Sequence, residues 1–261
     1  MLLIDKYAYF NGLKRIHPIE KMFFAFSLLF FSLAVKDVIV SLATFSVMSL
    51  FILFGAKIPV NYLIKLLLLP FFFLLSGIVT ILFSIADIDA DMPNVIWSSS
   101  FISWNLYITS DSLTSAFQLF CIAMGSISCL YFLILTTPVH DILKVLRKLK
   151  IPQLLIEIME ITYRFIFVFL ETTSSIYQAQ NSRLGYRTKR QWLYSISLLI
   201  SALFIGVFKR AKELTNAMES RAYANEMGYM DDGYNLSAAS WLVISAILAC
   251  LTIVYILWGG R

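Results

Sequence analysis

The chain has 261 residues, of which 59% are hydrophobic and only 14% are charged, and its formal net charge is +5. Soluble domains carry about 45–50% apolar and about 25% charged residues, so this composition excludes an ordinary soluble protein. It predicts an all-α polytopic membrane protein with about five transmembrane helices and about two or three long helices close to the cytoplasmic surface.

Five apolar runs are the candidates for membrane spans. The last of them has 21 residues without a charge, and as a helix it would extend about 32 Å, enough for the bilayer core. Pro70 falls inside the third run, where we expect it to kink the helix. The five runs cover residues 22–35, 38–54, 62–86, 113–135 and 238–258.

The distribution of Lys and Arg predicts how these spans are oriented. Four basic residues precede the first run, none lies in the loop at 87–111, and nine lie between residues 136 and 191. Because Lys and Arg accumulate in cytoplasmic segments, we expect a cytoplasmic N-terminus and a cytoplasmic basic block. The loop between them, with four Asp and the aromatics Trp97, Trp104 and Tyr107, is then external.

The basic block opens a region of different character. Thr137-Pro138 predicts the start of a short amphipathic helix that ends before Pro152. Its apolar stripe is expected to comprise residues 139, 142, 143, 146 and 149. This pattern also fits a basic helix lying on a membrane surface.

Two longer helical segments follow in the basic block. The first, from residue 155 to 180, carries a polar stripe that includes Glu160 and Arg164 at i,i+4 spacing, too charged for a lipid-exposed span. The second contains an apolar stretch of 16 residues at 193–208, which is short for a span.

We favour an arrangement in which neither long segment crosses the bilayer, although the sequence leaves open whether 193–208 does. The chain then divides into N-terminal transmembrane helices (1–135), a cytoplasmic region (136–235) and a C-terminal transmembrane helix (236–261).

The pattern Ala-x-x-Ser-Arg ends each of the two long segments. The copies, Ala179–Arg183 and Ala217–Arg221, begin 38 residues apart. Positions i and i+3 share a helix face, so each Ala–Ser pair makes a smooth patch beside an Arg whose planar fork suits a carboxylate or a carbonyl cluster. A single arginine at a helix end would favour a role in the helix dipole or in lipid contact. The repeat instead favours a partner protein with two matching binding sites, one for each arginine.

Several motifs occur together in this region and at the N-terminus. They are Leu146-Arg147-x-Leu149-x-Ile151-Pro152, Tyr163-Arg164-Phe165, the two Arg-ended helices, Ile4-Asp5-Lys6-Tyr7-Ala8 and Ile16-His17-Pro18. From about residue 4 to about residue 258 the chain resembles the transmembrane T component of energy-coupling factor (ECF) importers. The N-terminal motifs are similar to those of the cobalt/nickel branch, the CbiQ-type subunits.

The resemblance implies an energy-coupling function. In that family, arginine motifs on two long coupling helices dock in grooves of two ATP-binding-cassette ATPase subunits and transmit their closure to a substrate-binding membrane subunit. The corresponding positions here are Ser182-Arg183-Leu184 and Ser220-Arg221-Ala222, with Ala179 and Ala217 as packing neighbours. Ser before each Arg, and Leu or Ala after it, departs from the family's usual Ala-Arg-Gly.

The resemblance also implies the partners and the location. We expect a multi-pass protein of the bacterial cell (inner) membrane that assembles with the two ATPases and a metal-specific S/M-type membrane subunit, with room for a small accessory membrane subunit. Membrane lipid is an expected contact, and nucleic acid is not. The substrate would be cobalt or nickel, held by the partner rather than by this chain, which is expected to bind neither metal nor cofactor.

Two alternatives remain at the sequence level. The permease half of a conventional ABC importer would have one coupling helix between spans rather than two arginine-ended helices. A membrane-embedded enzyme would need acidic, His or Cys residues clustered at membrane depth, whereas the chain has two His and its three Cys lie in apolar runs. We find no nucleotide-binding P-loop motif and no catalytic residue, so we expect no enzyme activity and assign ATP hydrolysis to partners.

Overall fold

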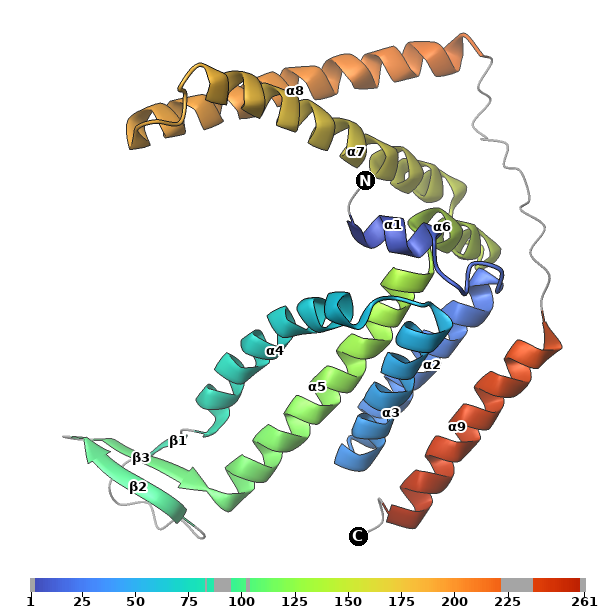
Figure 1. Cartoon of the computed structure of the whole chain (residues 1–261), viewed down its shortest axis with the longest axis vertical. Coiled ribbons are helices and arrows are strands. Elements are labelled where there is room, and N and C mark those ends of the chain that lie inside the picture. The colour runs from blue at the N-terminus through green and yellow to red at the C-terminus, as the bar shows by residue number, and fades with distance from the viewer. Residues whose placement is uncertain (1–2, 83, 87–94, 102–103, 222–236, 259–261) are drawn as a thin grey trace. The chain divides into compact units, whose positions relative to one another are not determined.

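The computed structural model in Figure 1 describes residues 3–82, 84–86, 95–101, 104–221 and 237–258. Asp87, Asp89 and Asp91 of the Asp-rich loop therefore lie outside the described residues. The chain splits into two compact units. One comprises Leu2–Pro138 with Gly233–Arg261, and the other comprises Val139–Asp232.

The helices of the first unit are the apolar helices predicted from the sequence and the short helix α1 (Leu3–Tyr9), which was not predicted. The others are α2 (Pro18–Val35), α3 (Val38–Leu50), the π-helix η1 (Phe51–Gly55), α4 (Val60–Leu82), α5 (Ser110–Thr136) and α9 (Ala238–Trp258). Side-chain caps begin two of them, since His17 Nδ1 accepts from the Ile19 N–H and Asp37 Oδ1 accepts from the Ile39 N–H. Helix α4 continues through Pro70.

Helix α5 is at the centre of this unit and contacts α2, α3 and α4. Its backbone comes close to α3 at Gly125, where an added Cβ would lie 2.9 Å from the Ser41 carbonyl oxygen. Ser32 and Ser41 are fully buried beside it, with their hydroxyls 3.3 Å apart. Small side chains at this point let three helices pack backbone to backbone, as membrane helices commonly do.

A small antiparallel sheet connects α4 to α5. Its strands are β1 (Ser84–Ala86), β2 (Val95–Phe101) and β3 (Trp104–Thr109), in the order β1-β3-β2. The sequence analysis did not predict these strands, and it extended the third apolar run through residues that form β1. The run ends as a helix at Leu82.

Within the described residues, six helices are long and apolar enough to cross a membrane. Five of them correspond to the predicted spans, which confirms the predicted class of multi-pass membrane protein with α-helical spans. The sixth is α8 (Lys189–Glu219), which contains the stretch 193–208. Helix α8 qualifies by its length and composition.

The second unit consists of α6 (Val139–Lys148), α7 (Gln153–Ser182) and α8. The predicted amphipathic helix and both long helices are confirmed as helices. The buried face of α6 differs from the predicted stripe, because Asp141, Leu143 and Val145 are buried while Leu149 is 65% exposed. Leu149 lies beyond the helix end and next to Lys150, whose positive φ turns the chain.

Candidate functional site

The α7–α8 corner holds Arg183 at the end of a well-formed helix terminus. Arg183 is the C-cap of α7, and Leu184 follows with a φ of 57°. The Gly185 N–H donates to the Gln180 carbonyl (2.9 Å) and the Leu184 N–H donates to the Asn181 carbonyl (3.0 Å). This pair of bonds is a Schellman motif, which satisfies the last carbonyls of a helix and fixes the direction in which the chain leaves.

Side chains lock the same corner onto α8. Gln180 Nε2 donates to the Ser195 carbonyl (3.1 Å), and the Tyr186 hydroxyl donates to Gln180 Oε1 (2.6 Å). Ser195 Oγ donates to the Gly185 carbonyl (2.8 Å). A Cβ on Gly185 would lie 2.7 Å from Ser195 Oγ and 3.0 Å from the Gln180 carbonyl oxygen, so any other residue would require the Ser195 side chain to move. The backbone that carries Arg183 is therefore fixed by contacts on both helices.

Arg221 has a similar place at the end of α8. The helix ends at Glu219, Ser220 is its C-cap, and the Arg221 N–H donates to the Met218 carbonyl (3.1 Å). The third member of this predicted motif, Ala222, lies outside the described residues. Arg183 and Arg221 thus mark opposite ends of α8, whose 31 residues extend about 46 Å at about 1.5 Å per residue.

The small residues beside the two arginines are exposed and locally satisfied. Ser182 Oγ donates to the Gln178 carbonyl, and Ser220 Oγ donates to the Ala217 carbonyl, both at 3.0 Å. Ala179, Ala217 and Leu184 are also exposed. Each predicted patch is therefore open to a partner, and each serine already has an acceptor within its own helix.

Both arginines are exposed. Within the described part of the chain, neither guanidinium has a carboxylate within 4.0 Å. An exposed guanidinium without a nearby carboxylate is available for the bidentate contact that Arg makes with a carboxylate of another protein.

A groove of about 430 Å³ runs between α7 and α8 and brings Arg221 next to residues that the sequence analysis did not associate with it. Its lining combines apolar residues, which include Phe165 and Leu214, with charged ones. The charged residues lining it are Glu160, Arg164, Arg210, Glu213 and Arg221. The i, i+4, i+8 spacing of Arg210, Leu214 and Met218 is the sequence signal that could have placed this face of α8 opposite α7.

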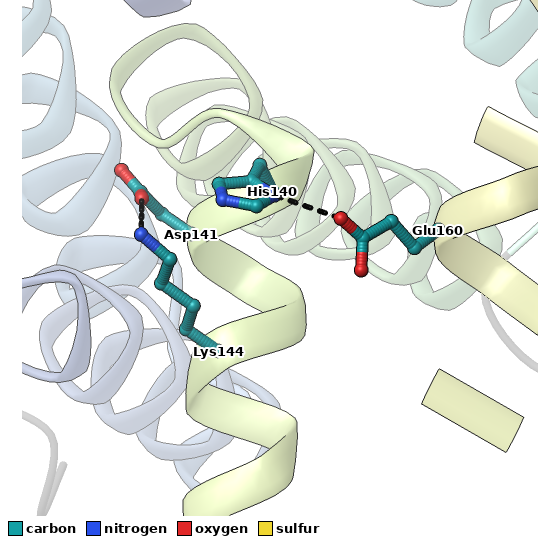
Figure 2. Close-up of polar contacts among 4 residues, drawn as sticks. All are labelled: His140, Asp141, Lys144 and Glu160. Carbon is teal, nitrogen blue, oxygen red and sulfur yellow. Dashed lines mark ion pairs between the residues drawn. The ribbon is translucent and has the colours of Figure 1, made fainter. Parts of the chain in front are cut away.

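The polar stripe on α7 makes a further contact with α6, shown in Figure 2. Glu160 Oε1 lies 3.6 Å from His140 Nδ1, and Lys144 Nζ lies 3.9 Å from Asp141 Oδ1 on α6 itself. Glu157, also on α7, is 3% exposed and accepts from Gln153 Nε2 at 3.1 Å. The sequence predicted Arg164 as the partner of Glu160 and did not reveal His140, which lies on another helix.

Metal-ligating side chains do not gather in the described ranges, where no group of three His, Cys, Asp or Glu could hold an ion.

Comparison with known proteins identifies the family. The profile of the family described as "CbiQ: Cobalt transport protein" matches residues 11–230. An uncharacterized protein of Methanocaldococcus jannaschii is 29% identical over 96% of this chain and 93% of its own length. The cobalt transport protein CbiQ of Rhodobacter capsulatus is 30% identical over 76% of this chain and 73% of its own length.

A further relative is named for energy coupling rather than for cobalt. The energy-coupling factor transporter transmembrane protein EcfT of Ruminiclostridium cellulolyticum is 29% identical over 73% of this chain and 74% of its own length. The Rhodobacter capsulatus and Ruminiclostridium cellulolyticum relatives are named as transport proteins. The chain therefore belongs to the CbiQ cobalt transport family and is a transmembrane component of cobalt/ECF-type transport.

Proposed function

We propose that this chain is the coupling subunit of an ECF-type importer for cobalt or nickel. Arg183 and Arg221 each contact one of two ATP-binding-cassette ATPase subunits, and α7 and α8 transmit the closure of those subunits to a metal-specific membrane subunit. The observation that carries this proposal is the placement of two exposed arginines at opposite ends of α8.

The rigidity of the α7–α8 hairpin supports a mechanical function. A displacement at one arginine can be passed along a helix only if the helix is held to its neighbour. The Gln180–Ser195 and Ser195–Gly185 hydrogen bonds tie α7 to α8 at the Arg183 end. At the other end, Leu214 and Met218 of α8 line a groove with Ile161 and Phe165 of α7.

The apolar surface of the hairpin supports contact with membrane subunits or lipid. Large side chains along α7 and α8 are left exposed, among them Leu155, Ile158, Ile166, Leu198, Phe204 and Phe208. Apolar surface on this scale is a feature of interaction sites. We assign it to the metal-specific subunit and the bilayer, and we assign the ion itself to that subunit.

The proposal includes a topology. The N-terminus and residues 136–235 are cytoplasmic, and the loop at 87–111 is external, in a bacterial inner membrane. This arrangement places both arginines on the side where ATPases reside.

A conventional ABC permease is the competing function. It would engage its ATPase through one coupling helix, so a single arginine substitution would abolish contact and the other would be silent.

The test is co-purification of the tagged chain from membranes in mild detergent, followed by identification of the bound subunits. The proposal requires two ATPase subunits, whether identical or different, and a second polytopic membrane subunit. Recovery of the chain with an ATPase dimer and no further membrane subunit would favour the conventional permease.

A further inference from the structure

The first unit contains a cavity of about 300 Å³ near the start of α2 and α9. Apart from Glu20, Lys21 and Ser240 its lining is apolar, and it includes Leu13, Phe24, Phe132, Val243 and Ile244. These residues come from the segment before α2 and from α2, α5 and α9. The Lys21 ammonium is buried and donates to the Thr136 carbonyl at 3.0 Å. The volume lies at the lower end of the range for small-molecule sites, about 300–1,000 Å³.

Glu20 lines this apolar cavity and is only 1% exposed. Its Oε1 accepts from the Ser237 N–H at 2.8 Å, at the start of α9. Its other oxygen, Oε2, is buried and has no hydrogen-bond partner among the described residues. A buried carboxylate oxygen without a donor is costly, so a donor supplied from outside would be stabilised there.

The cavity lies at one end of two candidate membrane spans. Helix α2 begins at Pro18 and α9 begins at Ala238, so the cavity lies beside the first turns of two candidate spans. Leu13 and Ile16 form one edge of the cavity, and Lys14 and Arg15 between them are exposed. Basic side chains at this level can bind a phosphate, while an acyl chain occupies the apolar wall.

We propose that this cavity binds a phospholipid with a primary-amine headgroup, of the phosphatidylethanolamine type. The ammonium group donates to Glu20 Oε2, the phosphate contacts Lys14 or Arg15, and part of one acyl chain lies against Phe24, Phe132 and Val243. A charge-assisted N–H to carboxylate bond is stronger than a neutral one. The bound lipid also strengthens the link between α2 and α9, because it contacts Glu20, which accepts from the Ser237 N–H at the start of α9.

The test is native mass spectrometry of the purified full chain with added phosphatidylethanolamine, phosphatidylcholine or phosphatidylglycerol of identical acyl chains. Phosphatidylcholine carries the same charges but has no N–H to donate. We expect phosphatidylethanolamine to bind at least about tenfold more tightly than phosphatidylcholine, the difference expected for one charged hydrogen bond. Equal binding of all three lipids by the wild-type chain would overturn the proposal without any variant being needed.

Variants then locate the site. Glu20→Gln keeps an acceptor for the Ser237 N–H and removes the free carboxylate oxygen, so phosphatidylethanolamine should lose its preference over phosphatidylcholine. Ser240→Trp should fill the cavity and weaken both lipids, whereas Ile253→Trp, at an exposed position further along α9, should change neither. An unchanged lipid preference in Glu20→Gln contradicts the assignment.

A photo-reactive amino acid at Val243 distinguishes lipid from protein in the membrane. We expect cross-linking to lipid, both in the isolated chain and in the assembled transporter. Cross-linking to a partner polypeptide instead would show that the cavity receives a protein side chain, and the lipid proposal would be wrong.

Discussion

Replacing Gln180 by Leu tests whether the α7–α8 corner positions Arg183. The Gln180 side chain joins three parts of the corner, since it accepts from the Tyr186 hydroxyl and donates to the Ser195 carbonyl on α8. Leu has a similar volume and a good helix propensity, so α7 itself should persist. The substitution removes the contacts that fix the corner and leaves Arg183 in place.

The magnitude follows from the two hydrogen bonds that are lost. Each intramolecular hydrogen bond contributes about 0.5–1.5 kcal/mol net, so the corner should lose about 1–3 kcal/mol. At about 1.4 kcal/mol per factor of ten, local opening should become about 5- to 150-fold more frequent. Amide protection at Leu184 and Gly185 should fall by the same factor, because their N–H groups make the Schellman bonds.

The assay is hydrogen exchange of residues 184–186, paired with retention of the ATPase subunits during purification. Gln178→Leu is the matched control, since Gln178 is an exposed residue of the same helix. We expect Gln180→Leu to lower both protection and retention, and Gln178→Leu to lower neither. If Gln180→Leu loosens the corner and retention is unchanged, the position of Arg183 does not matter for ATPase contact.

Three further predictions concern packing, orientation and activity. Gly125→Ala should destabilise the folded chain in detergent by about 1–3 kcal/mol through overpacking, because the new Cβ would lie 2.9 Å from the Ser41 carbonyl oxygen. Thermal melts measure this loss. Gly77→Ala is the control and should leave the melting temperature unchanged, because no atom lies within 4 Å of its added Cβ. An impermeant thiol label should reach a cysteine at Ser99 from outside intact cells and one at Ser182 only after permeabilisation; external labelling of Ser182 would overturn the cytoplasmic placement of α7. The purified chain alone should hydrolyse no ATP, and steady phosphate release that persists through repeated purification would contradict the assignment of hydrolysis to partners.

The helices could be predicted because their signals are local. Runs of apolar residues, Pro138 at a helix start and Pro152 after a helix end are all short-range features, and α2, α3, α5, α6, α7 and α9 follow such signals closely. The duplicated arginines were found for the same reason, since a repeat is visible without a structure.

Contacts between elements were the part that the sequence did not reveal. The antiparallel pairing of β3 with β1 and β2 joins segments across a loop, and strand pairing of this kind depends on neighbours rather than on propensity. His140 lies 20 positions before Glu160, so no helical spacing connects them. Leu184 adopts a positive φ that sequence reasoning assigns to glycine, and here the Schellman bonds hold it there.

The paired arginines are the central claim, and their separate contributions can be measured. Truncating one partner of a desolvated charge contact costs about 2–5 kcal/mol, which corresponds to about 30-fold or more in affinity for that site. Since both arginines belong to one chain, Arg183→Ala or Arg221→Ala alone should retain part of the complex through the remaining arginine contact. Lys at either position should rescue poorly, because it keeps the charge and loses the planar fork.

The most direct measurement is retention of the ATPase subunits on membranes that contain the double variant Arg183→Ala/Arg221→Ala. The account predicts that this variant inserts normally, loses its ATPase subunits and takes up no metal. Arg187→Ala, an exposed arginine on the same corner, is the control and should cost under about 1 kcal/mol. If the double variant retains the ATPase subunits as well as Arg187→Ala does, the two arginines do not couple this chain to them.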